Sequence, residues 1–118
     1  MPNILIADDE KAIRKTLKEI LEFEGYHVDE AEDGAKALNM IREFDYDLVL
    51  CDIKMPKMDG MEVLSKAMAE TAETPFIMIS GHGTVENAVE ATKKGAFDFI
   101  SKPPDLNRLL ITIRNALE

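Results

Sequence analysis

At four places in the sequence, a short apolar run is followed by acidic, hydroxyl or lysine side chains. The apolar runs are residues 4–7, 48–51, 76–79 and 97–100. The polar residues that follow them are Asp8-Asp9-Glu10, Asp52, Ser80 and Lys102. Short β-branched or aliphatic runs are typical of buried parallel strands, whose carboxyl ends meet at one edge of a sheet. Acids, a hydroxyl and a lysine at that edge indicate a site for a divalent cation and a phosphoryl group.

The acidic residues have the chemistry of a magnesium site. Neighbouring carboxylates repel one another, and a bound cation relieves that repulsion. Mg²⁺ prefers oxygen ligands and commonly uses one or two carboxylates together with water and phosphate. We expect Asp9 and Asp52 to be direct ligands and Asp8 to act through water. The backbone carbonyl of Lys54, two residues after Asp52, is expected to complete the shell.

A cation held between carboxylate and phosphate permits covalent chemistry on an aspartate. An aspartate oxygen attacks phosphorus in line, and the product is an aspartyl phosphate. The Ser80 hydroxyl is expected to hydrogen-bond one phosphoryl oxygen, and Lys102 to pair with another.

Strand-like and helix-like segments alternate along the whole chain. The predicted strands are residues 3–7, 26–31, 47–51, 76–79 and 97–100. The predicted helices are residues 11–24, 35–44, 61–70, 84–94 and 107–117. Five βα units with short connections predict an α/β fold, with a parallel sheet covered on both faces and right-handed crossovers.

Two strand orders suit such a doubly wound (βα)5 sandwich: the flavodoxin-like order 2-1-3-4-5 and a Rossmann half. A nucleotide or flavin site favours a glycine- or hydroxyl-rich loop after the first strand. The loop here is Asp8-Asp9-Glu10, which favours the flavodoxin-like order. In that order the first and third strands are neighbours, so Asp8, Asp9 and Asp52 meet.

Composition restricts the remaining function classes. A length of 118 residues suits one domain, and a net charge of −9 disfavours direct binding to nucleic acid or anionic membranes. One cysteine excludes an intramolecular disulfide and indicates a reducing cytoplasm. The sequence has no signal-peptide pattern and no apolar stretch near the ~20 residues needed to span a bilayer.

The motifs together resemble the receiver domain of bacterial two-component response regulators, over essentially all 118 residues. They are Asp8-Asp9-Glu10, the stretch 52–60 (DIKMPKMDG), Ser80-Gly81-His82 and Lys102-Pro103. The resemblance implies Asp8 and Asp9 as the acidic metal pair, Asp52 as the phosphate acceptor, Ser80 as the switch hydroxyl, Phe99 as the switch aromatic and Lys102 as the phosphate-sensing lysine. It also implies a cis peptide bond at Lys102-Pro103.

Residues 80–99 resemble receivers of the nitrogen-regulatory, sigma-54-activator class. Such receivers are usually fused to an ATPase and a DNA-binding domain, neither of which fits within 118 residues. The chain is therefore either an excised receiver or a stand-alone one that acts through protein–protein interaction. The implied function is a switch: a histidine kinase phosphorylates Asp52 with Mg²⁺ present, and the surface of the fourth helix, fifth strand and fifth helix changes, with homodimer formation as one outcome.

Three other functions compete with this one. A dehalogenase-like hydrolase would carry a second aspartate where Lys54 stands, so the only expected enzymatic chemistry is self-phosphorylation and autodephosphorylation. A flavin or nucleotide module is disfavoured by the acidic first loop, and nothing supports a phosphorylation-independent interaction domain. His82 is either an ordinary loop residue or a contact of the attacking water, and Met55 and Met58 are either core or partner-facing residues.

Overall fold

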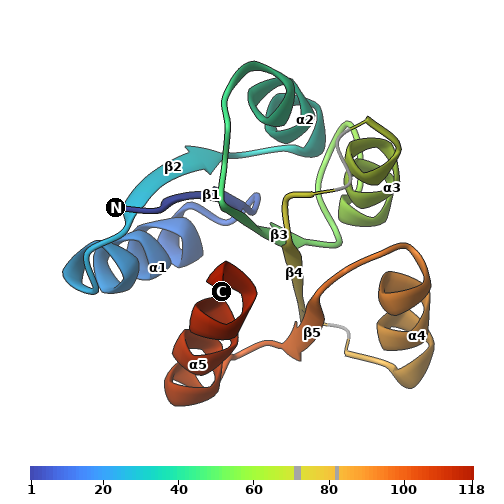
Figure 1. The fold of residues 1–118 in the computed structure, drawn as a ribbon. Helices are drawn as coiled ribbons and strands as arrows, with labels where there is room; N and C mark the ends of the chain where they lie inside the picture. The colour runs from blue at the N-terminus through green and yellow to red at the C-terminus, as the bar shows by residue number, and fades with distance from the viewer. Residues whose placement is uncertain (71–72, 82) are drawn as a thin grey trace.

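The computed structural model describes residues 1–70, 73–81 and 83–118. Within these residues the strands are β1 (Asn3–Ala7), β2 (His27–Ala31), β3 (Leu48–Asp52), β4 (Phe76–Ser80) and β5 (Asp98–Ser101). The helices are α1 (Lys11–Phe23), α2 (Gly34–Glu43), α3 (Gly60–Glu70), α4 (Val85–Lys93) and α5 (Leu106–Leu117). Strands and helices alternate along the chain as the sequence predicts (Figure 1).

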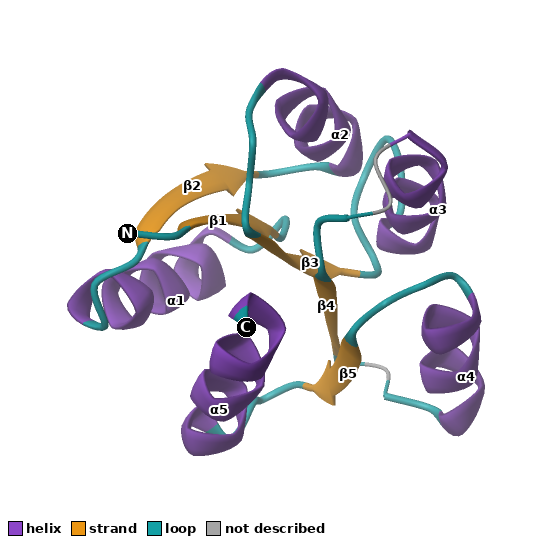
Figure 2. Ribbon diagram, viewed as in Figure 1, coloured by secondary structure: helices purple, strands orange, loops and turns teal. Residues whose placement is uncertain are grey.

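The described strands form one parallel sheet in the order β2-β1-β3-β4-β5. This is the flavodoxin-like order, and it excludes the Rossmann half. Helices α1 and α5 cover one face of the sheet, and α2, α3 and α4 cover the other (Figure 2). The central strand β3 is buried along its whole length, as expected for a strand with helices on both faces.

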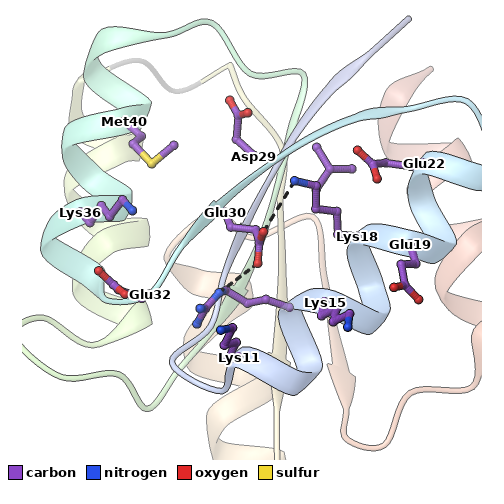
Figure 3. A pocket seen from close by; sticks show the side chains of 12 residues that line it. Lys11, Lys15, Lys18, Glu19, Glu22, Asp29, Glu30, Glu32, Lys36 and Met40 are labelled. Atoms are coloured by element: carbon purple, nitrogen blue, oxygen red, sulfur yellow. Dashed lines mark hydrogen bonds and ion pairs between the residues drawn. The ribbon is translucent and has the colours of Figure 1, made fainter.

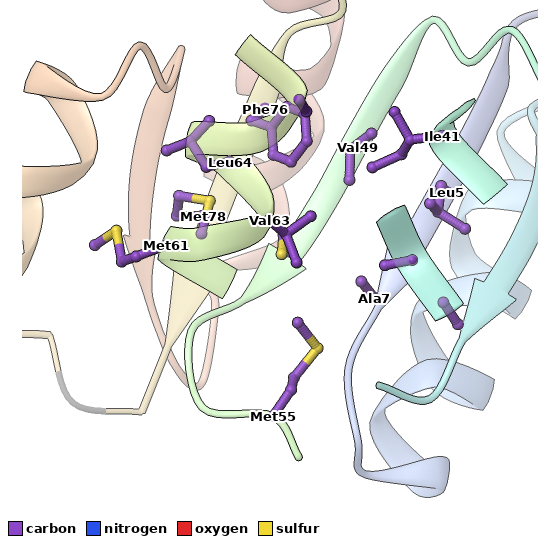
Figure 4. Close-up of a cluster of buried hydrophobic side chains, with 14 of the residues drawn as sticks. Leu5, Ala7, Ile41, Val49, Met55, Met61, Val63, Leu64, Phe76 and Met78 are labelled. Carbon is purple, nitrogen blue, oxygen red and sulfur yellow. The ribbon is translucent and has the colours of Figure 1, made fainter. Parts of the chain in front are cut away.

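Alternate residues of each strand enter two separate cores, because successive side chains of a strand point to opposite faces. Leu5 and Ala7 of β1 pack with α2, α3 and α4, whereas Ile4 and Ile6 pack with α1 and α5. Figure 4 shows part of the first core, including Met55 from the loop after β3. Met55 is 9% exposed there, so it is a core residue and not a partner-facing one.

Local capping helps to set the helix ends, which lie within one residue of the predicted bounds. The side chains of Asp33, Thr84 and Asp105 each accept a hydrogen bond from the backbone N–H three residues later, which caps α2, α4 and α5. Gly25 and Gly95 follow α1 and α4 with φ of 93° and 103°, a backbone conformation that favours glycine. No helix in the described parts of the chain is long and apolar enough to cross a bilayer.

Candidate functional site

The predicted site residues lie at the carboxyl edge of the sheet. Asp52 is the last residue of β3 and Ser80 the last residue of β4. Asp8 directly follows β1, and Lys102 directly follows β5. Because the strands are parallel and β1 lies beside β3, these side chains converge at one edge as the sequence predicts.

The Lys102 ammonium lies between two buried carboxylates. Its Nζ atom is 2.7 Å from Oδ2 of Asp8 and 3.1 Å from Oδ2 of Asp52. The side chains of Asp8 and Asp52 are only 4% and 8% exposed, and that of Lys102 is 13% exposed. The more exposed Glu10 carboxylate lies 3.8 Å from the same nitrogen. A single cation therefore offsets the charge of two acids that water reaches poorly.

Backbone N–H groups hold the other oxygen of each buried carboxylate. Oδ1 of Asp8 accepts a hydrogen bond from the N–H of Glu10 at 2.8 Å. Oδ1 of Asp52 accepts one from the N–H of Ile53 at 2.8 Å. Each carboxylate is thus oriented by its own loop, with its second oxygen directed to Lys102.

Burial raises the pKa of Asp52 above its ordinary value, and the negative charge of Asp8 adds to the effect. The hydrogen bond from Lys102 opposes this shift but does not cancel it. Burial alone would lower the pKa of Lys102, but its hydrogen bonds to Asp8 and Asp52 outweigh burial and raise that pKa. The site therefore favours an additional positive charge near Asp52.

Asp8, Asp9 and Glu10 form a cluster of oxygen donors. One carboxylate oxygen from each lies within 4.8 Å of the others. Hard oxygen donors of this kind fit Mg²⁺ better than a soft metal. Asp52, an expected direct ligand, is outside this group of three, and the ammonium of Lys102 lies between it and Asp8.

Glu10 is the member of this cluster that the sequence reasoning did not assign as a ligand. The position of Glu10 directly after Asp8 and Asp9, in the same loop, could have indicated it as a further oxygen donor. A pocket of about 190 Å³ opens beside the cluster. Its walls are Asp9, Glu10, Asp52, Lys54, Gly81 and Lys102, so Lys54 lies beside the carboxylates, and its carbonyl as a cation ligand stays a prediction.

The expected switch residues lie on β4 and β5. Ser80 is 1% exposed, and its backbone carbonyl accepts a hydrogen bond from the N–H of Lys102 at 2.8 Å. Phe99 is partly buried against the core formed with α2, α3 and α4. The Lys102-Pro103 peptide bond is cis, as the resemblance implies. His82, a predicted neighbour of the site, lies outside the described residues.

Comparison with curated proteins gives relatives that are much longer than this chain. The regulatory protein AtoC of Escherichia coli K12 is 38% identical over 115 residues, which are 98% of this chain and 25% of AtoC. The nitrogen assimilation regulatory protein NtrX of Azorhizobium caulinodans is 43% identical over 118 residues, covering 98% of this chain and 26% of NtrX. The nitrogen-regulatory resemblance is confirmed, and the chain spans about a quarter of these relatives.

Solved structures agree with the fold over nearly the whole chain. A CheY-like receiver domain protein from Methanospirillum hungatei has a TM-score of 0.95 and 39% identity, covering 99% of this chain and 94% of that one. A beryllofluoride-activated NtrC4 receiver domain dimer has a TM-score of 0.93 and 38% identity, covering 99% and 97%. The family model for the response regulator receiver domain matches residues 4–114. The chain therefore belongs to the response regulator receiver domain family.

Proposed function

We propose that residues 1–118 form a single phosphoacceptor domain in which Asp52 receives a phosphoryl group from a sensor histidine kinase. The observation that carries the proposal is the ammonium of Lys102, 2.7 Å from Asp8 and 3.1 Å from Asp52, at the edge of a pocket with free volume for a phosphoryl group. Asp8, Asp9, Asp52 and the backbone carbonyl of Lys54 would hold Mg²⁺. When bound, Mg²⁺ supplies positive charge between the carboxylates and the phosphoryl oxygens.

In the proposed reaction, an oxygen of the Asp52 carboxylate attacks phosphorus of the kinase phosphohistidine. The phosphorus–nitrogen bond breaks, and its electron pair stays on the histidine ring. Lys102 leaves its contact with Asp52 and pairs with a phosphoryl oxygen, because that group then carries the larger negative charge. The Ser80 hydroxyl donates to a second phosphoryl oxygen. Hydrolysis of the acyl phosphate returns Asp52 to its starting state.

The switch follows from the movement of Ser80. As Ser80 moves toward the phosphoryl group, Phe99 turns into the vacated space, and the surface formed by α4, β5 and α5 repacks. That surface carries exposed large apolar side chains, which supports a role in binding partners. They are Val85, Val89, Phe97 and Ile111. Phosphorylation shifts the population between two arrangements only if the phosphoryl group interacts better with one of them.

For the full-length protein we propose a cytoplasmic regulator of sigma-54-dependent transcription with ATPase and DNA-binding output domains. The support is that the relatives are about four times as long as this chain and include a nitrogen assimilation regulator. Homodimer formation on phosphorylation is part of the proposal, since the similar NtrC4 receiver is a dimer in its beryllofluoride-activated form. The acidic receiver itself is not expected to bind nucleic acid or membranes directly.

Incubation with acetyl phosphate and Mg²⁺, followed by intact-mass measurement, tests the proposal. The expected result is one phosphoryl-sized mass gain that is absent in the Asp52→Asn variant and absent with a chelator. A mass gain that persists in Asp52→Asn would overturn the assignment of the acceptor. A gain that persists with the chelator would overturn the metal requirement, and no gain would favour a phosphorylation-independent module.

A further inference from the structure

Arg14 connects the acidic loop after β1 to the edge of the sheet. It lies on α1, and its Nη1 atom donates a hydrogen bond to the backbone oxygen of Asp8 at 2.7 Å. Its Nε atom donates to Oε1 of Glu30 at 3.2 Å. The Arg14 side chain is 12% exposed and that of Glu30 is 32% exposed, so the arginine is largely buried while its ion pair is partly open to water. Arg14 and Glu30 themselves are not among the site residues that the sequence identifies, although one of the contacts reaches the backbone of Asp8.

Glu30 anchors the arginine from the other side. It lies on β2, the edge strand, and its second oxygen is 3.7 Å from Nζ of Lys18, which also belongs to α1. Figure 3 shows Glu30 and Lys18 in a charged pocket of about 780 Å³ that is lined by residues of α1, β2 and α2. Because Glu30 is held by two cations of α1, it can fix the plane of the Arg14 guanidinium.

The backbone on both sides of Asp8 is thereby held in place. The N–H of Asp8 donates to the backbone oxygen of Ala31 at 3.1 Å, and its C=O accepts from Arg14. The peptide group whose C=O accepts from Arg14 joins Asp8 to Asp9. Its orientation sets the direction in which the Asp9 carboxylate leaves the loop relative to that of Asp8.

We propose that Arg14 is a positioning residue for the cation site: it fixes the Asp8–Asp9 peptide so that the two carboxylates face one cation. The inference rests on the proposed function, since it assumes that a divalent cation binds to Asp8 and Asp9. Arginine suits the role because its planar guanidinium directs Nε and Nη1 toward two partners at fixed angles. Loss of such an outer contact typically weakens metal binding by about ten- to a hundredfold.

A titration with Mn²⁺ measures this effect directly, and Mg²⁺ is then added as a competitor. The free Mn²⁺ signal in electron paramagnetic resonance gives Kd for the wild type, Arg14→Met and Arg42→Met. Arg42→Met is the matched control, because Arg42 makes a two-bonded ion pair with Glu70 that connects α2 and α3 away from the site. Urea unfolding of each variant establishes that it is folded during the titration. Phosphorylation by acetyl phosphate is measured over the same range of metal concentration.

We expect Kd to rise about tenfold in Arg14→Met and to stay within about twofold of wild type in the control, whose exposed pair is far from the site. Phosphorylation of Arg14→Met should reach the wild-type level at saturating metal, with its half-maximal metal concentration shifted by the same factor. If Arg14 only stabilised the fold, Arg14→Met would lower the final level of phosphorylation, or Kd would rise equally in Arg42→Met. If Arg14→Met does not fold, Glu30→Ala replaces it, with an expected rise in Kd of about threefold from loss of one ion pair.

A Kd of Arg14→Met within twofold of wild type would overturn the inference, as would an equal rise in Arg42→Met. If Glu30→Ala is used, an unchanged Kd would likewise overturn the inference. Absence of Mn²⁺ binding by the wild type would instead overturn the proposed metal site, and the inference with it. The two failures are therefore distinguished by the wild-type titration.

Discussion

Replacing Lys102 by methionine removes the ammonium between Asp8 and Asp52 and keeps a side chain of similar length. Both carboxylates stay in place with 4% and 8% of their surface exposed, but no cation then offsets their charge. Removing one partner of a fully buried ion pair typically costs about 3–5 kcal/mol. Here each carboxylate keeps one backbone N–H donor, and the pocket beside them admits water. We therefore expect a loss of about 2–3 kcal/mol at pH 7, equivalent to a fall in Tm of about 10 °C.

Urea unfolding followed by circular dichroism at pH 7 in EDTA measures this loss. The chain has no tryptophan, so backbone ellipticity reports unfolding more directly than intrinsic fluorescence does. Lys66→Met is the control, because Lys66 pairs with Glu62 at 3.4 Å on the exposed surface of α3 and should leave the midpoint nearly unchanged. Excess Mg²⁺ should reduce the deficit of Lys102→Met, since a bound cation offsets the same carboxylates.

Acidification gives a second measure with a defined sign. Without the ammonium, an influence that lowers the pKa of Asp52 is lost, so that pKa rises further above its ordinary value. A carboxyl with a raised folded pKa binds its proton more tightly in the native state, and stability then increases as pH falls. The deficit of Lys102→Met should therefore shrink on going from pH 7 toward acid. A midpoint equal to that of wild type in EDTA would refute the view that Lys102 neutralises two buried charges.

Three further outcomes are expected. Asp52→Asn should stabilise the protein at pH 7, because the raised pKa of Asp52 makes its ionised form a cost to folding; the gain, measured by urea unfolding, should disappear below the ordinary aspartate pKa of about 3.9. Gly60→Ala should destabilise the protein by about 2 kcal/mol or more, since the added Cβ would overlap the backbone oxygen of Asp52. Gly81→Ala is the control, because a Cβ there meets open space, and its free energy of unfolding in urea should stay within about 0.5 kcal/mol of wild type. Equal urea midpoints for the two variants would contradict this. Cys51 should react with a thiol reagent only in denaturant, because its side chain is fully buried and burial raises its thiol pKa; rapid reaction of the native protein would be inconsistent with this packing.

Most of the architecture could be predicted from the sequence. Buried parallel strands require nearly continuous apolar runs, and helices with one buried face repeat apolar residues every three or four positions. Both patterns are local, so the predicted alternation of strands and helices is correct and no bound differs by more than one residue. One such difference is at β5, which begins at Asp98 and not at Phe97; Phe97 is half exposed, although its N–H donates to the backbone oxygen of Phe76 on β4.

The site edge was also predictable, for a topological reason. Once the strands are parallel, every residue at a carboxyl end lies at the same edge, so Asp8, Asp52, Ser80 and Lys102 were expected at that edge. The acidic loop after β1 favoured the strand order that the structure has. The roles of Ser80 and Phe99 concern a phosphorylated state, and that of the Lys54 carbonyl concerns a bound cation, so all three stay predictions.

What the sequence by itself determined is therefore the fold, the edge that carries the chemistry and the types of residue there. Only the tertiary structure decided which atoms meet. Lys102 lies between Asp8 and Asp52, although 94 residues separate it from Asp8 in the sequence. Arg14 contacts Asp8 and Glu30, and Met55 enters the core. Such contacts depend on how long side chains pack across elements that are distant in sequence, and no local periodicity encodes that packing.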